Sequence, residues 1–481
     1  MKLKGKLLVL TLPLLLTGLT GCGGKKSNGI QIKFWHTFGQ TVVDGLNKKI
    51  KDFTAAVKEH DGVSLEITLT YQGSYDDISK KITDGYSVKN YPTIAVAYPD
   101  NVADYLEIGK SAGQEFVVNL EDYANDSSIG FGKEAYLGDK KGADDFVEEF
   151  YAEGSRYAVK GLYSLPYMKS TEIMFYNFDM VNQAMKTYRP AIHGSEELIS
   201  EYMDTLTWDE FVNLTNYIQA HKADISSTLE VPFAYDSDAN LFITKMYQNE
   251  IPFTSIDSTG KGVLEFAKDE NRARVVTMLE GLNDLYHDGV MTTKGIRGTY
   301  GSDFFTGEKC VFSIGSSGGS GYNFPQADAF KLGVCPVPYS NNKQLYVTQG
   351  PTLALFNDSG LSKQLNEDTK TYAWKFMKYI TNGEVNADLC INGSEGYVPV
   401  RNSAYETKMF QEYVELGENY GKCASVVTEK INGAYLVSDA FKGSANLRTV
   451  CGSLLTAAVK ANKSEIPGLI QQAIDDALLK M

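Results

Sequence analysis

Small residues are concentrated in the stretch GSSGGSG, which runs from Gly315 to Gly321. The apolar residues 310–314 that precede it are typical of a buried strand. Hydroxyls and backbone N–H groups stay accessible at such a strand end, and a helix that began there would offer free N–H groups to an anion or a hydroxyl-rich ligand. A flexible linker between domains has the same composition. The stretch alone is compatible with both interpretations.

No catalytic or metal-binding pattern is recognisable around this stretch. It has no neighbouring histidine or acidic residue, and it lacks the lysine of a phosphate-binding P-loop. No two of the five histidines have the HxH or HxxxH spacing of a metal site, and the acidic segment 120–160 lacks the rhythm of a calcium loop. No motif selects a glycosidase pair from the 60 acidic residues. We therefore expect neither a metal nor a cofactor.

Strands and helices alternate in the N-terminal part of the chain. Apolar patterns predict strands at 30–34, 65–69 and 92–98, and helices at 41–58 and 76–86. This β-α-β-α-β order is typical of a parallel sheet covered by helices, and hence of an α/β fold. Ligands of such sheets bind beyond the carboxyl ends of the strands. The loops after these three strands are therefore candidate binding loops.

Those three loops are rich in aromatic and polar residues. The first contains WHT from Trp35, the second is YQGSY and ends at Tyr75, and the third is PDN, which includes Asp100. Aromatic rings, amides and hydroxyls with few charges are suited to a sugar- or polyol-binding wall. Ordinary packing is the alternative explanation for each aromatic residue.

The remainder of the chain also alternates helices with short strands. A capped helix start is predicted at Thr207, with Glu210 three residues later, and Trp208 between them is expected to pack. Further helices are predicted at 208–222, 239–249 and 270–288, and short strands at 311–314, 332–338 and 350–356.

Length and charge restrict the domain organisation and the partners. With 481 residues the chain is too long for one ordinary hydrophobic core, so two or three domains are expected. The formal charge of −14 repels nucleic acids and anionic lipid headgroups, and no basic cluster offsets it. We expect no nucleic-acid partner.

The N-terminus has the features of a targeting segment. Three lysines precede an apolar stretch, 7–16, that is shorter than the roughly 20 residues needed to cross a bilayer. The sequence LTGC that ends at Cys22 resembles the lipobox of bacterial lipoproteins, in which the cysteine becomes the lipidated first residue after cleavage. We expect a signal peptide at 1–21, a lipidated Cys22, a tether at 22–29 and anchoring to a membrane by the lipid. An ordinary secretory peptide with a chance cysteine is the alternative.

Five further cysteines follow Cys22, an odd number that cannot form a complete disulfide framework. None belongs to a CxxC pair of the kind found in zinc and redox sites. We expect most of them to be small buried residues. They are Cys310, Cys335, Cys390, Cys423 and Cys451.

Several short segments, in a fixed order, resemble those of the extracellular solute-binding proteins of bacterial ABC importers, and most of all the glycerol-3-phosphate and maltose-type sugar binders. The resemblance covers about residues 30–460. It is carried by FWH at 34–36, YQGSY at 71–75, YN at 176–177, TW at 207–208, FTGEKC at 305–310, SSG at 316–318, GV at 333–334 and GYVP at 396–399.

This resemblance implies a type II periplasmic-binding-protein-like fold. Two α/β lobes, each a mostly parallel sheet flanked by helices, would be discontinuous in sequence and joined by hinge strands. The implied N-terminal lobe comprises residues 30–167 and 350–395, and the implied C-terminal lobe comprises residues 168–349 and 396–481. A ligand in the cleft would stabilise the closed form because it contacts both lobes.

The resemblance also implies ligand-binding positions. Arg448 is the most discriminating of them, because a guanidinium can bind a phosphate through two hydrogen bonds; a structural salt bridge is its alternative role. The acidic ligand residue of the family falls at Pro99 in this chain, so the adjacent Asp100 is the candidate replacement. The other matching positions are Tyr75, Ser170, Ser316, Gly350 and Tyr397.

The leading hypothesis is a monomeric receptor, anchored by lipid to the outer face of the cell membrane, that performs no bond chemistry. It would capture a sugar, polyol or glycerol-phosphate-type solute and deliver it to the membrane subunits of an ABC permease. A cell-surface glycoside hydrolase and an adhesin-type lipoprotein are the alternatives. On the leading hypothesis the Gly/Ser stretch lies at the cleft, with Ser316 facing the ligand.

Overall fold

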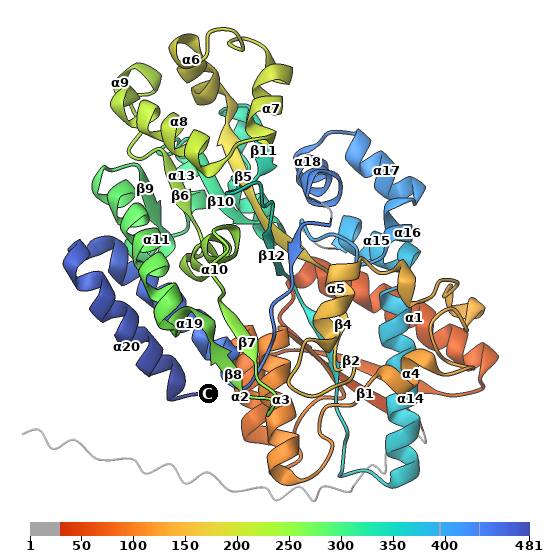
Figure 1. Ribbon diagram of the computed structural model, residues 1–481. Coiled ribbons are helices and arrows are strands. Elements are labelled where there is room, and N and C mark those ends of the chain that lie inside the picture. The colour runs from red at the N-terminus through yellow and green to blue at the C-terminus, as the bar shows by residue number, and fades with distance from the viewer. Residues whose placement is uncertain (1–28, 394–395, 432) are drawn as a thin grey trace, which may run out of the picture.

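A computed structural model describes residues 29–393, 396–431 and 433–481 (Figure 1). The expected signal peptide 1–21, the lipidated Cys22 and all of the tether except its last residue lie outside the described residues. Within the described part of the chain, no helix is both long enough and apolar enough to cross a membrane.

The first of two large sheets contains β1 (Ile30–His36), β2 (Leu65–Tyr71), β3 (Ile94–Ala97), β4 (Leu165–Pro166) and β13 (Thr352–Leu355). Their order is β2-β1-β3-β13-β4. β1 pairs in parallel with both β2 and β3, which confirms the predicted β-α-β-α-β unit. β13 enters the sheet from much later in the chain and is antiparallel to β3 and β4.

The second large sheet contains β5 (Ser170–Asn177), β6 (Phe233–Tyr235), β9 (Met291–Thr293), β10 (Phe312–Ser316), β11 (Leu332–Pro336), β12 (Tyr346–Gln349) and β14 (Tyr435–Leu436). The order is β14-β12-β5-β10-β6-β9, with β11 also paired to β5. β10, β6 and β9 are mutually parallel, whereas β5 is antiparallel to β10, β11 and β12. On the other side of β5, β12 and β14 are also parallel, so the expected parallel arrangement is interrupted only by β5 itself.

Helices flank both sheets. In chain order the longer ones are α1 (Gln40–His60), α2 (Tyr75–Gly85), α3 (Pro99–Ala112), α6 (Phe178–Tyr188), α7 (Glu196–Asp204), α8 (Trp208–Ala220), α10 (Asp238–Gln248), α11 (Asp269–His287), α14 (Lys363–Ile380), α15 (Gly383–Gly393), α17 (Lys408–Glu415), α19 (Ser444–Lys460) and α20 (Ile466–Leu478). The shorter ones are α4 (Glu121–Asn125), α5 (Glu148–Ala152), α9 (Lys222–Ile225), α12 (Lys294–Arg297), α13 (Gly301–Thr306), α16 (Asn402–Tyr405) and α18 (Asn419–Ser425). A small hairpin is formed by β7 (Thr254–Ile256) and β8 (Gly262–Leu264).

Local sequence explains where these helices begin. At α8 the Thr207 hydroxyl accepts the backbone N–H of Glu210, and the Glu210 carboxylate accepts the backbone N–H of Thr207, which confirms the predicted capping box. Trp208 is buried and donates its indole N–H to Gln248 Oε1 at 2.8 Å, so it packs as expected. α1 turns Leu46 and Phe53 towards the core at helical spacing.

The two sheets with their helices make two lobes, which lie at the lower right and upper left of Figure 1. α14 and α15 pack with α1 in the N-terminal lobe, and α10, α11, α19 and α20 pack together in the C-terminal lobe. α16 and α17 pack on α15, and Val147 donates its backbone N–H to Val400 O at 3.0 Å. Residues 400–415 thus contact elements of the N-terminal lobe, whereas the expected boundary at residue 396 stays a prediction.

Segments that cross between the lobes lie side by side. Lys169 and Val398 exchange two backbone hydrogen bonds of 3.0 and 2.7 Å, and β5 pairs with the end of β12. The buried Lys169 ammonium lies 2.5 Å from Glu153 Oε2. Gly350 follows β12 with a φ of +88°, and a Cβ there would lie 2.4 Å from Met168 O, so only glycine fits this crossing.

All five cysteines that follow Cys22 are buried, as predicted. Each lies within a lobe and contributes to its core rather than to its surface.

Candidate functional site

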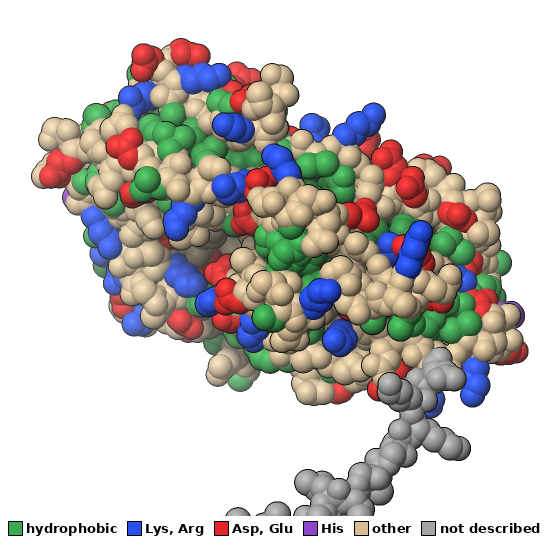
Figure 2. Space-filling view, turned by 90° about the horizontal axis from the view of Figure 1, so that it is seen from below, with side chains coloured by type: hydrophobic (Ala, Val, Ile, Leu, Met, Phe, Trp, Pro, Cys, Tyr) green, Lys and Arg blue, Asp and Glu red, His purple; other side chains and the backbone are tan. Residues whose placement is uncertain are grey.

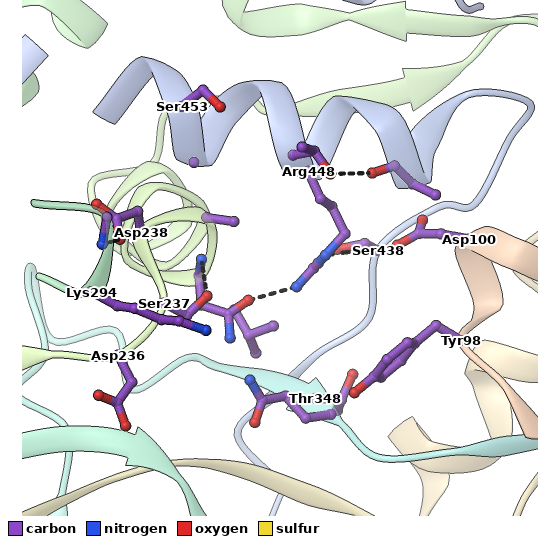
Figure 3. A pocket seen from close by; sticks show the side chains of 18 of the residues that line it. Tyr98, Asp100, Asp236, Ser237, Asp238, Lys294, Thr348, Ser438, Arg448 and Ser453 are labelled. Atoms are coloured by element: carbon purple, nitrogen blue, oxygen red, sulfur yellow. Dashed lines mark hydrogen bonds and ion pairs between the residues drawn. The ribbon is translucent and has the colours of Figure 1, made fainter. Parts of the chain in front are cut away.

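A cavity of about 720 Å³ lies between the two lobes (Figure 3). Its walls are formed by the starts of α3 and α10, by α12, by α19 and by the end of β12. In the view of Figure 2 the surface is hollowed between the lobes, with acidic and basic side chains at the margin. A cavity of this size accommodates a small molecule.

Asp100 and Arg448, two residues selected from the sequence, face each other in this cavity (Figure 3). Arg448 Nε lies 3.8 Å from Asp100 Oδ2, and Ser444 Oγ donates to Asp100 Oδ1 at 2.6 Å. One turn along α3, Asp104 Oδ1 accepts the backbone N–H of Gly443 at 3.0 Å. Because α3 belongs to the N-terminal lobe and α19 to the C-terminal lobe, these contacts join the lobes directly.

A chain of hydrogen bonds positions the Arg448 guanidinium. Its Nη2 donates to Asn240 Oδ1 at 2.5 Å, and Asn240 Nδ2 donates to Glu172 Oε1 at 3.2 Å. The Tyr235 hydroxyl donates to the other Glu172 oxygen at 2.5 Å. Burial raises the pKa of Glu172 to about 7, against the effect of these two donors. Arg448 is therefore held from one side by α10 and, through it, by β5.

Asp238 ties together three helices of the opposite wall. Its carboxylate accepts the hydroxyls of Thr293 at 2.6 Å and Thr456 at 2.8 Å, and the backbone N–H of Gly295 at 2.9 Å. These contacts connect the start of α10 with α12 and α19. Asp238 is thereby a structural residue of the cavity wall, with both oxygens engaged.

Lys294 is the second cation that lines the cavity. Figure 3 shows its side chain and that of Arg448 pointing towards the middle of the cavity, whereas the Asp236 carboxylate points away from it. Lys294 Nζ lies 3.7 Å from the ring centroid of Tyr300. Asp236 Oδ1 accepts the backbone N–H of Gly301 at 2.5 Å, and burial raises the pKa of Asp236 to about 6.

Three tyrosines form a cluster beside the cavity. The rings of Tyr75 and Tyr98 lie 4.4 Å apart, and a Cβ at Gly318 would come within 3.0 Å of the Tyr397 ring. Burial, followed by the proximity of Tyr397 and Tyr98, raises the pKa of Tyr75 well above its usual value. The cluster therefore presents neutral hydroxyls, of which that of Tyr98 reaches the cavity.

The Gly/Ser stretch is an ordered part of the C-terminal lobe. Ser316 ends β10, accepts the backbone N–H of Gly318 at 3.2 Å and donates to Ser170 Oγ at 3.3 Å. Ser317–Asn323 form 3₁₀ turns. Because the strands before and after the stretch both pair with β5, it connects no two domains, and the linker interpretation is wrong.

The structure separates the sequence-selected residues into two groups. Asp100 and Arg448 line the cavity. The others lie beside it, around the tyrosine cluster and the crossing strands, and Tyr98 connects the two groups through its contacts with Tyr75 and with the backbone of Gly350. This second group consists of Tyr75, Ser170, Ser316, Gly350 and Tyr397.

The binding wall expected after the first strand is not formed by Trp35 and His36. Trp35 is 8% exposed and His36 is 2% exposed, so both belong to the core. The His36 ring accepts the backbone N–H of Phe38 through Nδ1 at 3.1 Å, and burial lowers its pKa to about 4. Packing, the alternative weighed for each aromatic residue, explains these two.

Sequence reasoning missed six residues that line the cavity or hold Arg448 in place through hydrogen bonds. Three of them surround the start of α10, directly after the parallel strand β6. The rule that ligands bind beyond the carboxyl ends of parallel strands would have pointed to them, but β6 is only 3 residues long and gives too short an apolar pattern. The six are Tyr98, Glu172, Asp236, Asp238, Asn240 and Lys294.

A model of the family of bacterial extracellular solute-binding proteins matches residues 48–418 of this chain. The chain belongs to this family. As an extracellular solute-binding protein it binds its solute and performs no catalysis, so the glycoside hydrolase alternative is set aside. A search of curated proteins found no match.

Solved structures share the two-lobe fold of this solute-binding protein. The cyclic alpha-maltosyl-1,6-maltose binding protein from Arthrobacter globiformis is 14% identical, with a TM-score of 0.67 over 94% of this chain and 99% of that one. UgpB from Mycobacterium tuberculosis in complex with glycerophosphocholine is 16% identical, with a TM-score of 0.62 over 93% and 99%. Maltose-bound MalE3 of T. maritima is 16% identical, with a TM-score of 0.61 over 94% and 100%.

Proposed function

We propose that this solute-binding protein is the lipid-anchored receptor of an ABC importer and captures a sugar, polyol or glycerol-phosphate-type solute between its lobes. The observation that carries the proposal is that Asp100 of one lobe and Arg448 of the other face a cavity of about 720 Å³. A solute that bonds to both lobes favours their closed arrangement, which is the signal that a permease reads.

The similar solved structures support this ligand class. Their names record binding of a cyclic maltosyl-maltose, of glycerophosphocholine and of maltose. All three molecules carry many oxygen atoms that can form hydrogen bonds. The cavity described above offers the same kinds of partner: a guanidinium, an ammonium, a tyrosine hydroxyl and carboxylates.

A thermal-shift screen tests the binding function. Protein from residue 23 onward is mixed with saccharides, polyols, polyol phosphates and glycerophosphodiesters. A solute at 100 times its Kd should stabilise the protein by about 2.7 kcal/mol. Absence of stabilisation by every class would argue against the receptor function and in favour of an adhesin-type lipoprotein.

The anchor and the partners are part of the same proposal. Lipidation of Cys22 holds the protein at the outer face of the cell membrane, where it serves the permease subunits as a monomer. A Cys22→Ser variant of the full chain should leave the membrane fraction and appear in the medium. If the wild type and the Cys22→Ser variant are both found in the medium, the N-terminus is an ordinary secretory peptide.

A further inference from the structure

Lys294 has hydrogen-bonding capacity that the described residues do not use. Its ammonium carries three donors, lines the cavity and forms neither a hydrogen bond nor an ion pair within the described part of the chain. The face of the Tyr300 ring lies 3.7 Å from its Nζ, and Tyr300 is 51% exposed. The Asp236 carboxylate interacts with Lys294 through its charge, without a hydrogen bond or ion pair between them. A lysine on a flexible stem can leave such an exposed ring for a better partner.

The carboxylates that line the cavity are in the opposite situation. Five of them are present, and a simple charge count would favour a cationic ligand. Asp100, Asp236, Asp238 and Glu153 each accept a hydrogen bond or an ion pair from the protein itself. The fifth, Asp76, is exposed at the margin. Each of the four inner carboxylates thus has a partner in the protein for at least one oxygen, whereas the Lys294 ammonium has no hydrogen-bond acceptor among the described residues.

Arg448 adds further donors to those of Lys294. Of the five N–H groups of its guanidinium, one donates to Asn240, and the Asp100 carboxylate lies 3.8 Å from Nε. Both cations belong to the C-terminal lobe and point to the middle of the cavity (Figure 3). A ligand group rich in acceptors and negatively charged is the complement of this pair.

We propose that Lys294 determines the charge of the ligand: with Arg448 it binds an anionic group, a phosphate or a carboxylate, on a polyhydroxyl solute. This inference rests on the proposed receptor function and narrows it. On binding, the Lys294 ammonium leaves the Tyr300 ring for the anion, and the hydroxyls of the solute occupy the rest of the cavity.

Matched ligands and matched variants test the inference by isothermal titration calorimetry. The ligand series is glycerol with glycerol 3-phosphate, and glucose with glucose 6-phosphate and glucuronate. Lys294→Met removes the cation, and Lys294→Arg retains it. Arg297→Met is the control, because Arg297 lies on the same helix but stacks on Phe304 outside the cavity.

The expected result is preferential binding of an anionic member, with glucose 6-phosphate and glucuronate distinguishing phosphate from carboxylate. Lys294→Met should lower the affinity for that anion about 10- to 100-fold, which is the equivalent of a lost charge-assisted hydrogen bond. Arg297→Met should bind the anion as tightly as the wild type does. Lys294→Arg should retain most of the affinity.

Three results would overturn the inference. Neutral members that bind as tightly as their anionic counterparts would remove the charge preference while leaving the receptor function intact. If Lys294→Met and Arg297→Met lowered the affinity for the anion equally, the effect would come from the net positive charge of this helix and not from contact with Lys294. Binding of no member of the series would count against both the inference and the receptor function.

Discussion

The hydroxyl of Ser444 donates a hydrogen bond of 2.6 Å to Asp100 across the cleft. The residue from the N-terminal lobe that we assign to the ligand is thus already engaged with the C-terminal lobe. Arg448 Nε lies 3.8 Å from Oδ2, the other oxygen of the same carboxylate. The two lobes thus contact each other through groups proposed to bind the solute, so a solute that reaches Asp100 competes with these contacts while it forms its own bonds to both lobes.

Removing these contacts should open the ligand-free protein. In the double variant Asp100→Asn and Asp104→Asn, the two interlobe acceptors lose their charge, and each weakened hydrogen bond should cost the closed arrangement about 1 kcal/mol. We expect a larger radius of gyration by small-angle X-ray scattering. Asp76→Asn, at the cavity margin without a bond across the cleft, should leave the radius unchanged. An unchanged radius in the double variant would contradict the role of these contacts.

Arg448→Ala should separate ligand classes. Loss of the guanidinium should lower the affinity for a phosphorylated ligand by about 10- to 100-fold, because charge-assisted hydrogen bonds are lost. The affinity for a neutral sugar should fall less, because such a sugar has no negative charge that pairs with the guanidinium. Calorimetric titration of both ligand types measures the difference. Equal losses for the two would show that Arg448 is only a structural partner of Asn240.

Gly350→Ala should destabilise the crossing between the lobes. The substitution places a Cβ at a φ of +88° and 2.4 Å from Met168 O, so it adds a backbone clash to a conformational cost of about 1–2 kcal/mol. Gly298→Ala is the matched control, with a φ of +77° and no atom within 4 Å of the new Cβ. In urea denaturation Gly350→Ala should lose clearly more stability than Gly298→Ala. Equal losses would mean that the crossing strands adapt to the side chain.

Glu172 should make stability depend on pH. Its pKa is raised from 4.5 to about 7 by burial, so the folded protein holds a proton that the unfolded chain releases. The wild type should match Glu172→Gln below pH 4.5 and fall behind it as the pH rises to 7, by about 3 kcal/mol in full. Denaturation curves at several pH values measure this, with the exposed Glu59→Gln as the control. A difference that does not vary with pH would contradict the assignment.

Local patterns were sufficient for much of the fold. The β-α-β-α-β unit follows from apolar periodicity, and the start of α8 follows from Thr207 and Glu210, because these signals act within a few residues. The site was predictable only where the family resemblance supplied positions, as for Asp100 and Arg448. The contact between Arg448 and Asn240 joins residues 208 positions apart, and no local pattern predicts it.

Burial also escaped local reasoning. Trp35 and His36 carry the residue types of a binding wall, yet the pairing of β1 between β2 and β3 places both in the interior. The hydrogen bond from Ser444 to Asp100 could not be predicted from the sequence either, because it depends on how the two lobes meet. Sequence patterns identify groups able to bind a solute, and the tertiary structure decides which of them remain available.

The position of β13 has a consequence for how the protein is made. This strand, at residues 352–355, lies between β3 and β4 of the first sheet. During synthesis the N-terminal lobe cannot close its sheet when its first 166 residues have emerged, because an inner strand is still missing. The gap leaves the edges of β3 and β4 unpaired until nearly three-quarters of the chain is present. Such exposed edges favour aggregation, so we expect the sheet of this lobe to form only after β13 has been synthesised.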